Sequence, residues 1–481
     1  MQQESEVPEG WEWCRLGEIC EIVMGNSPPG ISYNADGEGI PLINGPAEFS
    51  KGPFGKTVIL KYTTEPTKLC KENDLLICVR GSTTGRTNIA GSQACIGRGV
   101  ALIRADVFQG YLNWYIHSNQ KKIYSLGTGS TFPSISYDDI SELAVPLPPL
   151  PEQHRIAAAI EALFARLDAA NARLERVPGI LKQFRQAVLA AACDGRLTEG
   201  WRVSQIVVGK RSDINSQSNK LLQREHLPVL PSSWIYCHTE LILAQDRPGI
   251  KTGPFGSMLK KHEHRNEGIP VFGIENVRSG KFIPGSKIHI SPEKAHELSN
   301  YDALPGDILI SRSGTVGEIC IVPDKIGEAR FSSNIMRVCL DREKILPEYC
   351  CELFQGSNLV RSQISSLCGG STRDFLNGRI LRSLVIPLPP LSEQYEIVRR
   401  VDSLFALVDQ IETRVAAARE RADTLRQSIL AQAFSGRLVP TEAELARQEG
   451  REYEPASVLL ERVCSEKKEK TGRRGVQSTL V

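Results

Sequence analysis

One stretch of about fifty residues occurs twice in this 481-residue chain, and the duplication limits the possible folds more than any other feature. Pro146-Leu-Pro-Pro-Leu150 recurs as Pro387-Leu-Pro-Pro-Leu391, an offset of 241 residues. The further matches at this offset are Glu152-Gln153 with Glu393-Gln394, Leu163-Phe164 with Leu404-Phe405, Asp168 with Asp409, Arg185-Gln186 with Arg426-Gln427, and Gly195-Arg-Leu197 with Gly436-Arg-Leu438. Because chance does not keep one register over this length, the sequence predicts two copies of one structural unit.

Each copy carries apolar residues at alternating steps of four and three, which is the spacing of a coiled-coil seam. The seam residues are Ile156, Ile160, Leu163, Leu167, Ala170, Leu174, Val177, Leu181, Phe184 and Val188 in the first copy, and Ile397, Val401, Leu404, Val408, Ile411, Val415, Ala418, Ala422, Leu425 and Ile429 in the second. The pattern predicts two helices, each on the order of 60 Å long at ~1.5 Å per residue. A buried helix of a bundle has a similar stripe, but two equal stripes favour an antiparallel pair.

The ends of both helices are marked in the sequence. Glu152 and Glu393 lie in the first turns, where a carboxylate is favourable beside the helix dipole. Gly195 and Gly436 fit a left-handed stop after the last turn. Pro178-Gly179 interrupts the first helix, so we expect a kink or a break there.

The remaining sequence is rich in short β-branched runs separated by glycine and proline, which predicts strands with long loops. We therefore expect an α+β fold in which two strand-rich domains are separated by two long helices packed as an antiparallel coiled coil, with pseudo-two-fold symmetry. The expected parts are a first domain (1–148), a first helix (149–199), a linker (200–229), a second domain (230–389), a second helix (390–439) and a tail (440–481). The tail is expected to hold a short helix around 456–463 and to end in a solvated basic segment.

Composition excludes several classes of protein. The formal net charge is only +2, so no global basic field attracts nucleic acid. The 13 cysteines include no Cys-x-x-Cys pair, which favours reduced thiols in a cytoplasmic protein over a disulfide framework. No apolar run is long enough to span a membrane.

We find no sequence pattern for catalysis or metal binding. The segment 81–87 superficially resembles a phosphate loop, but it has Arg86 where that loop needs lysine. His262 and His264 have no further ligands at metal-site spacing. The chain is therefore expected to have no catalytic centre and no metal site.

The motifs together resemble the specificity subunits of type I restriction-modification systems. In that family, two globular regions each precede a Pro-Leu-Pro-Pro-Leu-x-Glu-Gln helix that ends in Gly-Arg-Leu, and the resemblance covers essentially the whole chain. Trp-x-Trp-x-x-Leu-Gly-Glu-Ile, from Trp11 to Ile19, is typical of how the target-recognition domains begin, and Glu454 to Glu461 is similar to the C-terminal element. The second domain departs from the family because the segment after Trp234 lacks the Leu-Gly-Glu triplet.

The resemblance implies that each domain is a target-recognition domain for one half of a bipartite, asymmetric DNA site, with the coiled coil setting the spacing. It implies that two methyltransferase subunits dock on this scaffold and transfer methyl groups from S-adenosylmethionine to adenine N6. A motor-nuclease subunit that uses ATP and Mg would complete the restriction complex. Those cofactors belong to the partner subunits, and none is expected to bind this chain.

Residues that contact DNA are predicted on glycine-flanked loops after apolar strands, because arginine fits guanine and hydroxyl groups suit phosphates or base edges. In the first domain the candidates are Arg80, Ser82, Thr83 and Arg86, with Ser130 and Thr131 as a second set. In the second domain they are Arg312, Ser313 and Thr315 at the like position, with Ser371, Thr372 and Arg373, and with Lys260 and Lys261 as phosphate contacts. Alternatively, these loops only turn a strand and hold their arginines on nearby carboxylates.

Two other classes of function remain open at this point. A coiled-coil structural adaptor joining two protein-binding domains would share the seam, but it gives no reason for matched Arg-Gly loops. A self-contained endonuclease or methyltransferase would need motifs that the chain lacks.

Overall fold

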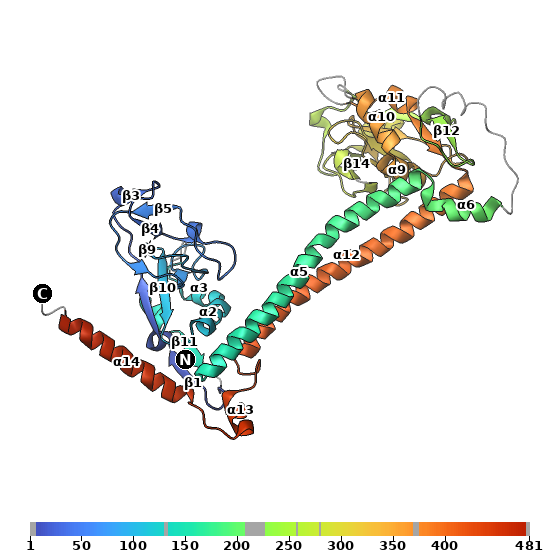
Figure 1. The fold of residues 1–481 in the computed structure, drawn as a ribbon. Coiled ribbons are helices and arrows are strands. Elements are labelled where there is room, and N and C mark those ends of the chain that lie inside the picture. The colour runs from blue at the N-terminus through green and yellow to red at the C-terminus, as the bar shows by residue number, and fades with distance from the viewer. Residues whose placement is uncertain are drawn as a thin grey trace. The chain divides into compact units, whose positions relative to one another are not determined.

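The computed structural model describes residues 6–128, 133–206, 227–255, 258–278, 280–368 and 375–477, with side chains described up to residue 469. The chain divides into two compact units (Figure 1). Unit 1 contains Met1–Leu174 and Ala417–Val481, and unit 2 contains Glu175–Ala416. Each unit therefore combines one strand-rich domain with a part of each long helix.

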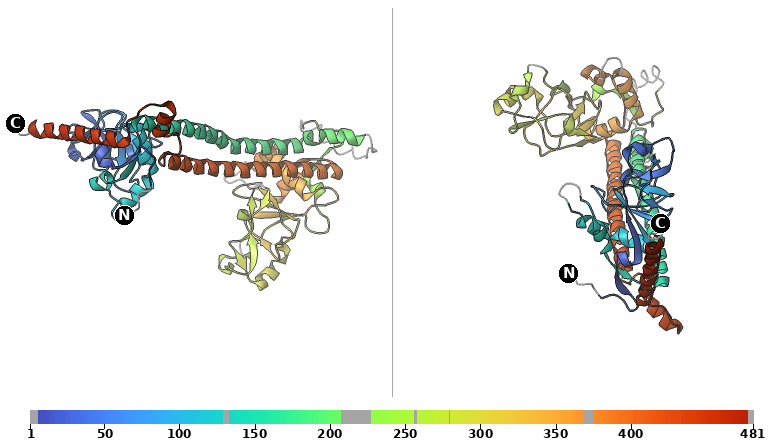
Figure 2. Two further views of the ribbon diagram at one scale, coloured as in Figure 1. Left: turned by 90° about the horizontal axis from the view of Figure 1, so that it is seen from below. Right: turned by 90° about the vertical axis from the view of Figure 1, so that its left-hand side faces the viewer.

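The two long helices form as the repeat predicts. Helix α5 spans Leu150–Cys193 (44 residues) and α12 spans Leu391–Ala433 (43 residues). Gly195 (φ 82°) and Gly436 (φ 68°) adopt the left-handed conformation after the last turns, which confirms the predicted stops. Within each unit a part of α5 lies beside a part of α12 (Figures 1 and 2).

Helix α5 is continuous through Pro178, so the predicted break is absent. A proline has no N–H, and the carbonyl four residues earlier, on Leu174, therefore loses its helical donor. The guanidinium of Arg419 on α12 donates to Leu174 O at 3.0 Å instead. Arg419 stands at the repeat position equivalent to Pro178, so the second helix supplies the donor that the first one lacks.

Arg419→Ala is therefore expected to lower the free energy of unfolding of unit 1 by about 1–3 kcal/mol, because it leaves the Leu174 carbonyl without a donor. In a Pro178→Ala background, which restores the backbone N–H, the same substitution should cost much less. Chemical denaturation of the four variants in a double-mutant cycle measures this coupling. Arg414→Ala, at an exposed position of α12, is the control. Equal costs in the two backgrounds would contradict the assignment.

The first domain is built on two main sheets and a short ladder. Its sheets have the strand orders β2-β10-β7-β8 and β3-β5-β4-β9-β6, and β1 pairs with β11. The strands are β1 (Glu12–Arg15), β2 (Cys20–Met24), β3 (Tyr33–Asn34), β4 (Ile40–Ile43), β5 (Lys61–Thr63), β6 (Leu69–Cys70), β7 (Leu75–Cys78), β8 (Thr87–Ile89), β9 (Ala94–Ile96), β10 (Val100–Ala105) and β11 (Ala144–Leu147). Helices α1 (Leu16–Ile19), α2 (Gln109–Ser118), α3 (Gln120–Leu126) and α4 (Tyr137–Ser141) accompany them.

The second domain repeats the central part of this topology. The order β13-β21-β18-β19 matches β2-β10-β7-β8, and the β12–β22 ladder matches β1–β11. The strands are β12 (Ile235–His238), β13 (Ile250–Thr252), β14 (Ile269–Phe272), β15 (Val277–Arg278), β16 (Lys281–Phe282), β17 (His289–Ile290), β18 (Ile308–Ser311), β19 (Ile319–Ile321), β20 (Arg330–Phe331), β21 (Ile335–Val338) and β22 (Val385–Leu388). The helices are α8 (Pro292–Glu297), α9 (Pro347–Gly356), α10 (Asn358–Cys368) and α11 (Gly378–Ser383), with α6 (Glu199–Ile206) after α5.

The Glu-Gln pair of each repeat ties its helix to its domain. Gln153 accepts a hydrogen bond from Phe108 N (3.1 Å), and Gln394 accepts one from Leu346 N (2.8 Å), at the start of α2 and α9. Buried Glu152 accepts from the Trp11 indole (3.0 Å), and Glu393 accepts from Thr198 and Arg202. Burial raises the pKa of Glu152 to about 6. These contacts explain why the pair recurs at a fixed offset.

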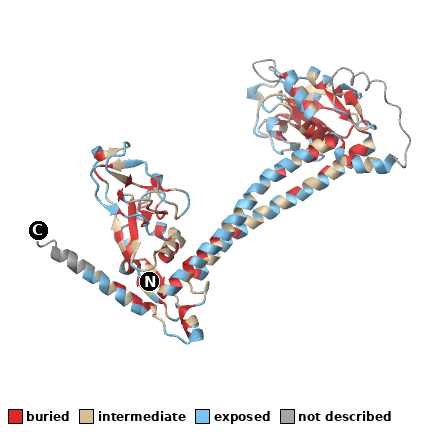
Figure 3. Cartoon of the chain, viewed as in Figure 1, coloured by how far each residue is buried: buried red, intermediate tan, exposed pale blue. Residues whose placement is uncertain are grey.

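The seam prediction was wrong at three positions. Ile160 and Val401 are buried, but Phe184 and Leu425 are 38% and 51% exposed, and Ala170 is also exposed. Along both long helices, exposed positions alternate with buried and partly buried ones (Figure 3). Beside Phe184 and Leu425, the residue one position later contacts the other helix, as in the ion pairs of Arg185 and Arg426 described below. The 4-3 spacing identifies the apolar residues of a helix, but it does not show whether these residues or their polar neighbours contact the other helix.

The predicted helix around 456–463 is present, but it is longer than expected, and one of the basic residues expected in solvent, Lys467, contacts the first domain. The C-terminal segment forms α13 (Glu442–Glu449) and α14 (Ala456–Gln477). Ala456, Leu459 and Val463 are 0%, 2% and 5% exposed and belong to the core of the first domain. The Lys467 ammonium donates to Gly17 O (2.7 Å) and Cys20 O (2.5 Å) of that domain. Unit 1 therefore needs both ends of the chain.

The cysteines match the sequence-based expectation. All 13 are free thiols, and every one except Cys464 is buried. Most of the linker predicted at 200–229 lies outside the described residues, apart from α6 and the segment that leads to β12.

Candidate nucleic-acid interface

The candidate loop of the first domain connects β7 to β8. Gly81 (φ 87°) and Gly85 (φ 84°) supply left-handed backbone, and Gly85 N donates to Cys78 O at 2.8 Å to close the hairpin. Arg80 and Ser82 are exposed, and Thr83 is partly exposed. The loop therefore presents polar side chains at a rigid turn.

This loop lies against the segment that carries the second candidate set. Arg80 bridges Ser134, and Gly81 N donates to Pro133 O at 3.0 Å. The Thr84 hydroxyl donates to Gly81 O (2.8 Å) and Pro133 O (3.1 Å). The candidates Ser130 and Thr131 themselves lie outside the described residues, as do Ser371, Thr372 and Arg373 of the second domain.

Arg86 is held inside the first domain. Its guanidinium donates to Phe49 O (3.2 Å) and Ser50 O (3.0 Å) and lies over the Phe49 ring. These contacts position the 49–50 loop, which leaves Arg80 as the more accessible arginine of the pair.

The corresponding loop of the second domain connects β18 to β19, but its register differs by one residue from the sequence-based match. The matched hydrogen bonds are Val79 N to Gly99 O (2.9 Å) with Arg312 N to Asn334 O (3.0 Å), and Ile135 N to Val79 O (3.0 Å) with Leu376 N to Arg312 O (3.1 Å). Arg312 therefore occupies the place of Val79, and Ser313 that of Arg80. The expectation that Arg80 and Arg312 are equivalent was wrong: from Asp74 to Gly81 and from Asp307 to Gly314 the two segments have the same length, and Arg312 stands one residue earlier in its segment than Arg80.

Arg312 contacts two aromatic rings. Its guanidinium is 5.0 Å from the centroid of Phe255 and 5.4 Å from that of Phe375. One amino group donates to Ser333 O at 3.3 Å. Partial removal from water lowers the pKa of this guanidinium. Sequence reasoning missed both phenylalanines; the signal was their place in glycine-flanked loops.

The other candidates of the second domain are accessible. Thr315, Lys260 and Lys261 are exposed, and the Ser313 hydroxyl donates to Asn334 Oδ1 at 3.0 Å. None of the candidates that the structure describes is held on a carboxylate by a side-chain ion pair. The alternative that the loop arginines only serve nearby carboxylates therefore has no support among the described residues.

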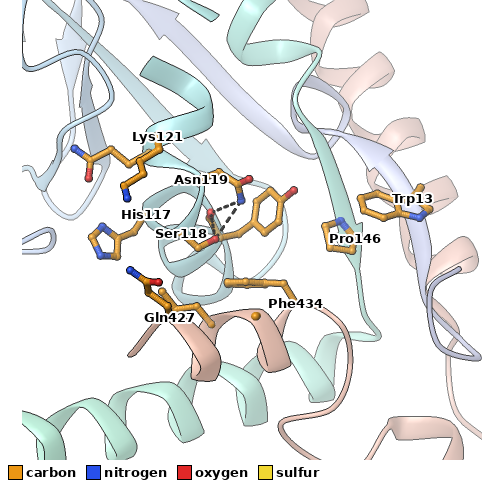
Figure 4. Close-up of a pocket in the computed structure, with 12 residues that line it drawn as sticks. Trp13, His117, Ser118, Asn119, Lys121, Pro146, Gln427 and Phe434 are labelled. Atoms are coloured by element: carbon orange, nitrogen blue, oxygen red, sulfur yellow. Dashed lines mark hydrogen bonds between the residues drawn. The ribbon is translucent and has the colours of Figure 1, made fainter. Parts of the chain in front are cut away.

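A cavity of about 650 Å³ in unit 1 is separate from these loops (Figure 4). It is lined by Ser118 and His117 of α2 and by Gln427 and Phe434 at the end of α12, among others. At the equivalent place in unit 2 the two helices are in close contact, since a Cβ at Gly356 would lie 2.6 Å from Leu189 Cβ. None of the residues predicted to contact DNA lines the cavity.

A family model described as the type I restriction modification DNA specificity domain matches residues 8–178 and 255–418, which is more than half of the chain. The chain belongs to the type I DNA-specificity family. This confirms the resemblance drawn from the paired helix motifs, and it identifies the protein as a non-catalytic DNA-recognition component of a type I restriction-modification system.

Curated relatives extend the match over the whole specificity subunit. The EcoKI specificity subunit of Escherichia coli K12 is 28% identical over 98% of both chains. The EcoDI specificity subunit of Escherichia coli is 31% identical over 76% of this chain and 78% of its own length.

Solved structures share the fold. The HsdS subunit from Thermoanaerobacter tengcongensis has a TM-score of 0.60 at 20% identity, covering 91% of this chain and all of that one. A chain from a structure of type I R-M complex assembly and conformational transition has a TM-score of 0.61 at 19% identity, covering 90% of this chain and all of that one. Among the described residues of the specificity subunit, no helix is long and apolar enough to cross a membrane.

Proposed function

We propose that each domain of this specificity subunit reads one half of a bipartite, asymmetric DNA site, and that α5 and α12 form an antiparallel coiled coil which sets the distance between the halves. The observation that carries the proposal is a contact that occurs twice. In unit 2, Arg185 pairs with Asp409 at 2.5 Å and lies over the Phe405 ring. In unit 1, Arg426 pairs with Asp168 and lies over the Phe164 ring.

The repeat offset exchanges the partners of these two contacts. Adding 241 residues converts Arg185 to Arg426 and Asp168 to Asp409. A reciprocal pair of this kind is expected from a two-fold axis between the helices. The order of the contacts supports an antiparallel pair, because in unit 1 Asp168 meets Arg426 while the later Leu174 meets the earlier Arg419.

The difference between the two loops supports an asymmetric site. A pseudo-two-fold scaffold presents the same part of each domain to DNA, as a symmetric dimer would. At one matched position the first domain has Val79 and the second has Arg312, and at the next they have Arg80 and Ser313. Different side chains at equivalent places are expected to read different base edges.

Replacing Arg312 with alanine tests this reading of the second domain. The variant complex should lose about 1–3 kcal/mol of binding at one base pair of the second half-site, with the first half-site unaffected. Methylome mapping of cells that carry the variant, followed by equilibrium binding to duplexes changed at each position, measures the effect. Equal loss on both half-sites and on random DNA would contradict a base contact.

The partners that we propose are two methyltransferase subunits and motor-nuclease subunits, which hold the S-adenosylmethionine, ATP and Mg. An exposed apolar side chain at the same repeat position of each long helix supports the two methyltransferase subunits. Phe184 in unit 2 and Leu425 in unit 1 are equivalent by the repeat and both are exposed, so the chain carries two related apolar surfaces. Two related surfaces suit two copies of one partner.

The native mass of the co-expressed complex should therefore correspond to one specificity chain and two methyltransferase chains. Phe184→Asp should release one copy, and Phe184→Asp with Leu425→Asp should release both, because each buries a charge in one interface. Gln183→Asp and Thr424→Asp, at the preceding exposed positions, are the matched controls. A complex of unchanged mass in the double variant would exclude this docking surface.

A further inference from the structure

Phe255 is a large apolar side chain that the second domain leaves in solvent. It is 55% exposed, although Gly253 and Pro254 just before it are buried. Gly253 cannot carry a side chain, since a Cβ there would lie 2.0 Å from Ser332 O. The backbone before Phe255 is therefore packed tightly on the segment that begins at Ser332.

The same segment fixes Arg312. Gly253 N donates to Ile335 O at 3.1 Å, while Ser333 O accepts from the Arg312 guanidinium at 3.3 Å. The ring of Phe255 and the guanidinium, 5.0 Å apart, are thus held by one stretch of backbone. Their relative placement is set before any ligand binds, which is a requirement for specific recognition.

Among the residues that the structure describes, Arg312 has no ion pair of the kind that its neighbours form. Arg247, Arg330 and Arg337 of the same domain each reach a carboxylate of Asp302, Asp307 or Glu328. For Arg312, the contacts found among the described residues are the Ser333 carbonyl and the two aromatic rings. Its Nε has no acceptor in that part of the chain. One amino group donates to Ser333 O, and the second makes no hydrogen bond with a described residue, so the second amino group is left to donate to a ligand.

We infer that Phe255 is a second specificity-determining residue of the second domain, and that its ring contacts the C5 methyl group of a thymine next to a guanine to which Arg312 donates. The inference rests on the proposed reading of a half-site by this domain. In the major groove a guanine offers two acceptors to a planar guanidinium, and a thymine offers an apolar methyl group to a phenylalanine. The neighbouring Arg312 and Phe255 side chains therefore suit a guanine and a thymine at adjacent positions.

The first domain provides an internal comparison. Gly25 N donates to Val100 O at 2.9 Å, as Gly253 N does to Ile335 O, so Ser27 stands at the place of Phe255. The Ser27 hydroxyl accepts from Arg98 N at 3.1 Å. With serine there and Val79 at the place of Arg312, the first domain has neither member of the pair. The Arg312–Phe255 pair therefore belongs to the second half-site alone.

The test uses the complete complex with its methyltransferase partner and duplexes that carry the genomic site found by methylome mapping. Each thymine of the second half-site is replaced in turn by deoxyuridine, which removes only the methyl group, and each guanine by 7-deazaguanine, which removes only the N7 acceptor. The wild-type complex should bind about 3–5-fold more weakly at one uracil, the effect of one methyl group, and more weakly still at the adjacent deazaguanine.

Phe255→Ser, which installs the residue of the first domain, should bind the natural duplex more weakly and should be insensitive to that uracil, while it keeps the sensitivity to deazaguanine. Arg312→Ala should show the reverse. Tyr395→Ser, which removes a 63% exposed aromatic ring of α12, is the control and should behave as wild type.

Equal uracil sensitivity of the wild type and Phe255→Ser at every thymine would overturn the inference. Uniform weakening of Phe255→Ser on random DNA would overturn it also, by assigning the ring to folding. Failure of the proposed function is distinguishable, because a wild-type complex that modifies no bipartite site would fail before any substitution is made.

Discussion

Leu459→Asp is expected to unfold the first domain and to abolish modification of the natural site, although residue 459 lies more than three hundred residues beyond that domain in the sequence. Leu459 is 2% exposed and packs with Trp11 and other residues of the domain core. Ala456 N, at the start of α14, donates to Gly10 O at 2.9 Å, which fixes the helix against the beginning of the chain. The first domain is therefore completed by the C-terminal segment.

The expected size of this effect follows from burial. Truncating a buried leucine to alanine costs about 2–5 kcal/mol, and an unpaired buried carboxylate adds a further desolvation cost. Together they reach a large part of the ~5–15 kcal/mol that stabilises a typical domain. Val458→Asp is the matched control, because Val458 is the neighbouring residue and is 49% exposed.

Limited proteolysis and thermal unfolding of the purified complex measure the outcome. Leu459→Asp should expose the first domain to protease while the second domain stays protected, and Val458→Asp should behave as wild type. If both variants kept the first domain folded, the C-terminal helix would be an accessory to that domain and not a part of its core.

The repeat allowed much of the fold to be predicted, because it marks local features. The helix starts at Glu152 and Glu393 and the left-handed stops at Gly195 and Gly436 depend on residues within one turn, and all four are where the sequence places them. Alternation of short strands with glycines predicted the two strand-rich domains in the same way. The family then followed from the spacing of these local signals.

Features that depend on contacts distant in sequence were not predictable in this way. Phe184 and Leu425 continue the apolar stripe, yet the helices meet on the adjacent row, where Arg185 and Arg426 form ion pairs. The apolar pattern of one helix does not show which residues beside it contact the other helix. The continuity of α5 through Pro178 depends likewise on Arg419 of the other repeat.

The candidate site was predicted to a lesser extent than the fold. Both Arg-Gly loops lie after apolar strands as expected, but the correspondence between Arg80 and Arg312 failed by one residue. Ladder hydrogen bonds determine which residue of a hairpin faces inward, and a match of Arg-Gly motifs does not include that information. Phe255 was missed because its exposure is a tertiary property.

The proposed pseudo-two-fold axis predicts that the two half-sites are read in opposite directions along the DNA. The ladders that close the two domains have the same register, with Glu12 opposite Leu147 and Ile235 opposite Leu388. Residues 12–147 are therefore exchangeable, strand for strand, for residues 235–388. Such a chimera carries the second domain at both positions. The chimera also carries Phe434→Cys, because Cys193 is the equivalent residue beside the second domain. It ends at Pro455, because α14 packs on the first domain, which the chimera lacks.

The chimera is expected to direct methylation to an inverted repeat of the second half-site, with the natural spacing unchanged, because the proposed two-fold axis would relate the two domains with opposite directions along the duplex. Methylome mapping of cells that carry the chimera and the methyltransferase subunit reads both the sequence and its direction. A direct repeat would exclude the two-fold relation and leave only the duplication of the chain. The natural asymmetric site would show that the first position does not determine a half-site. The inverted repeat requires that α5 and α12 hold their domains as equivalent arms, so this single measurement tests the scaffold and the recognition domains together.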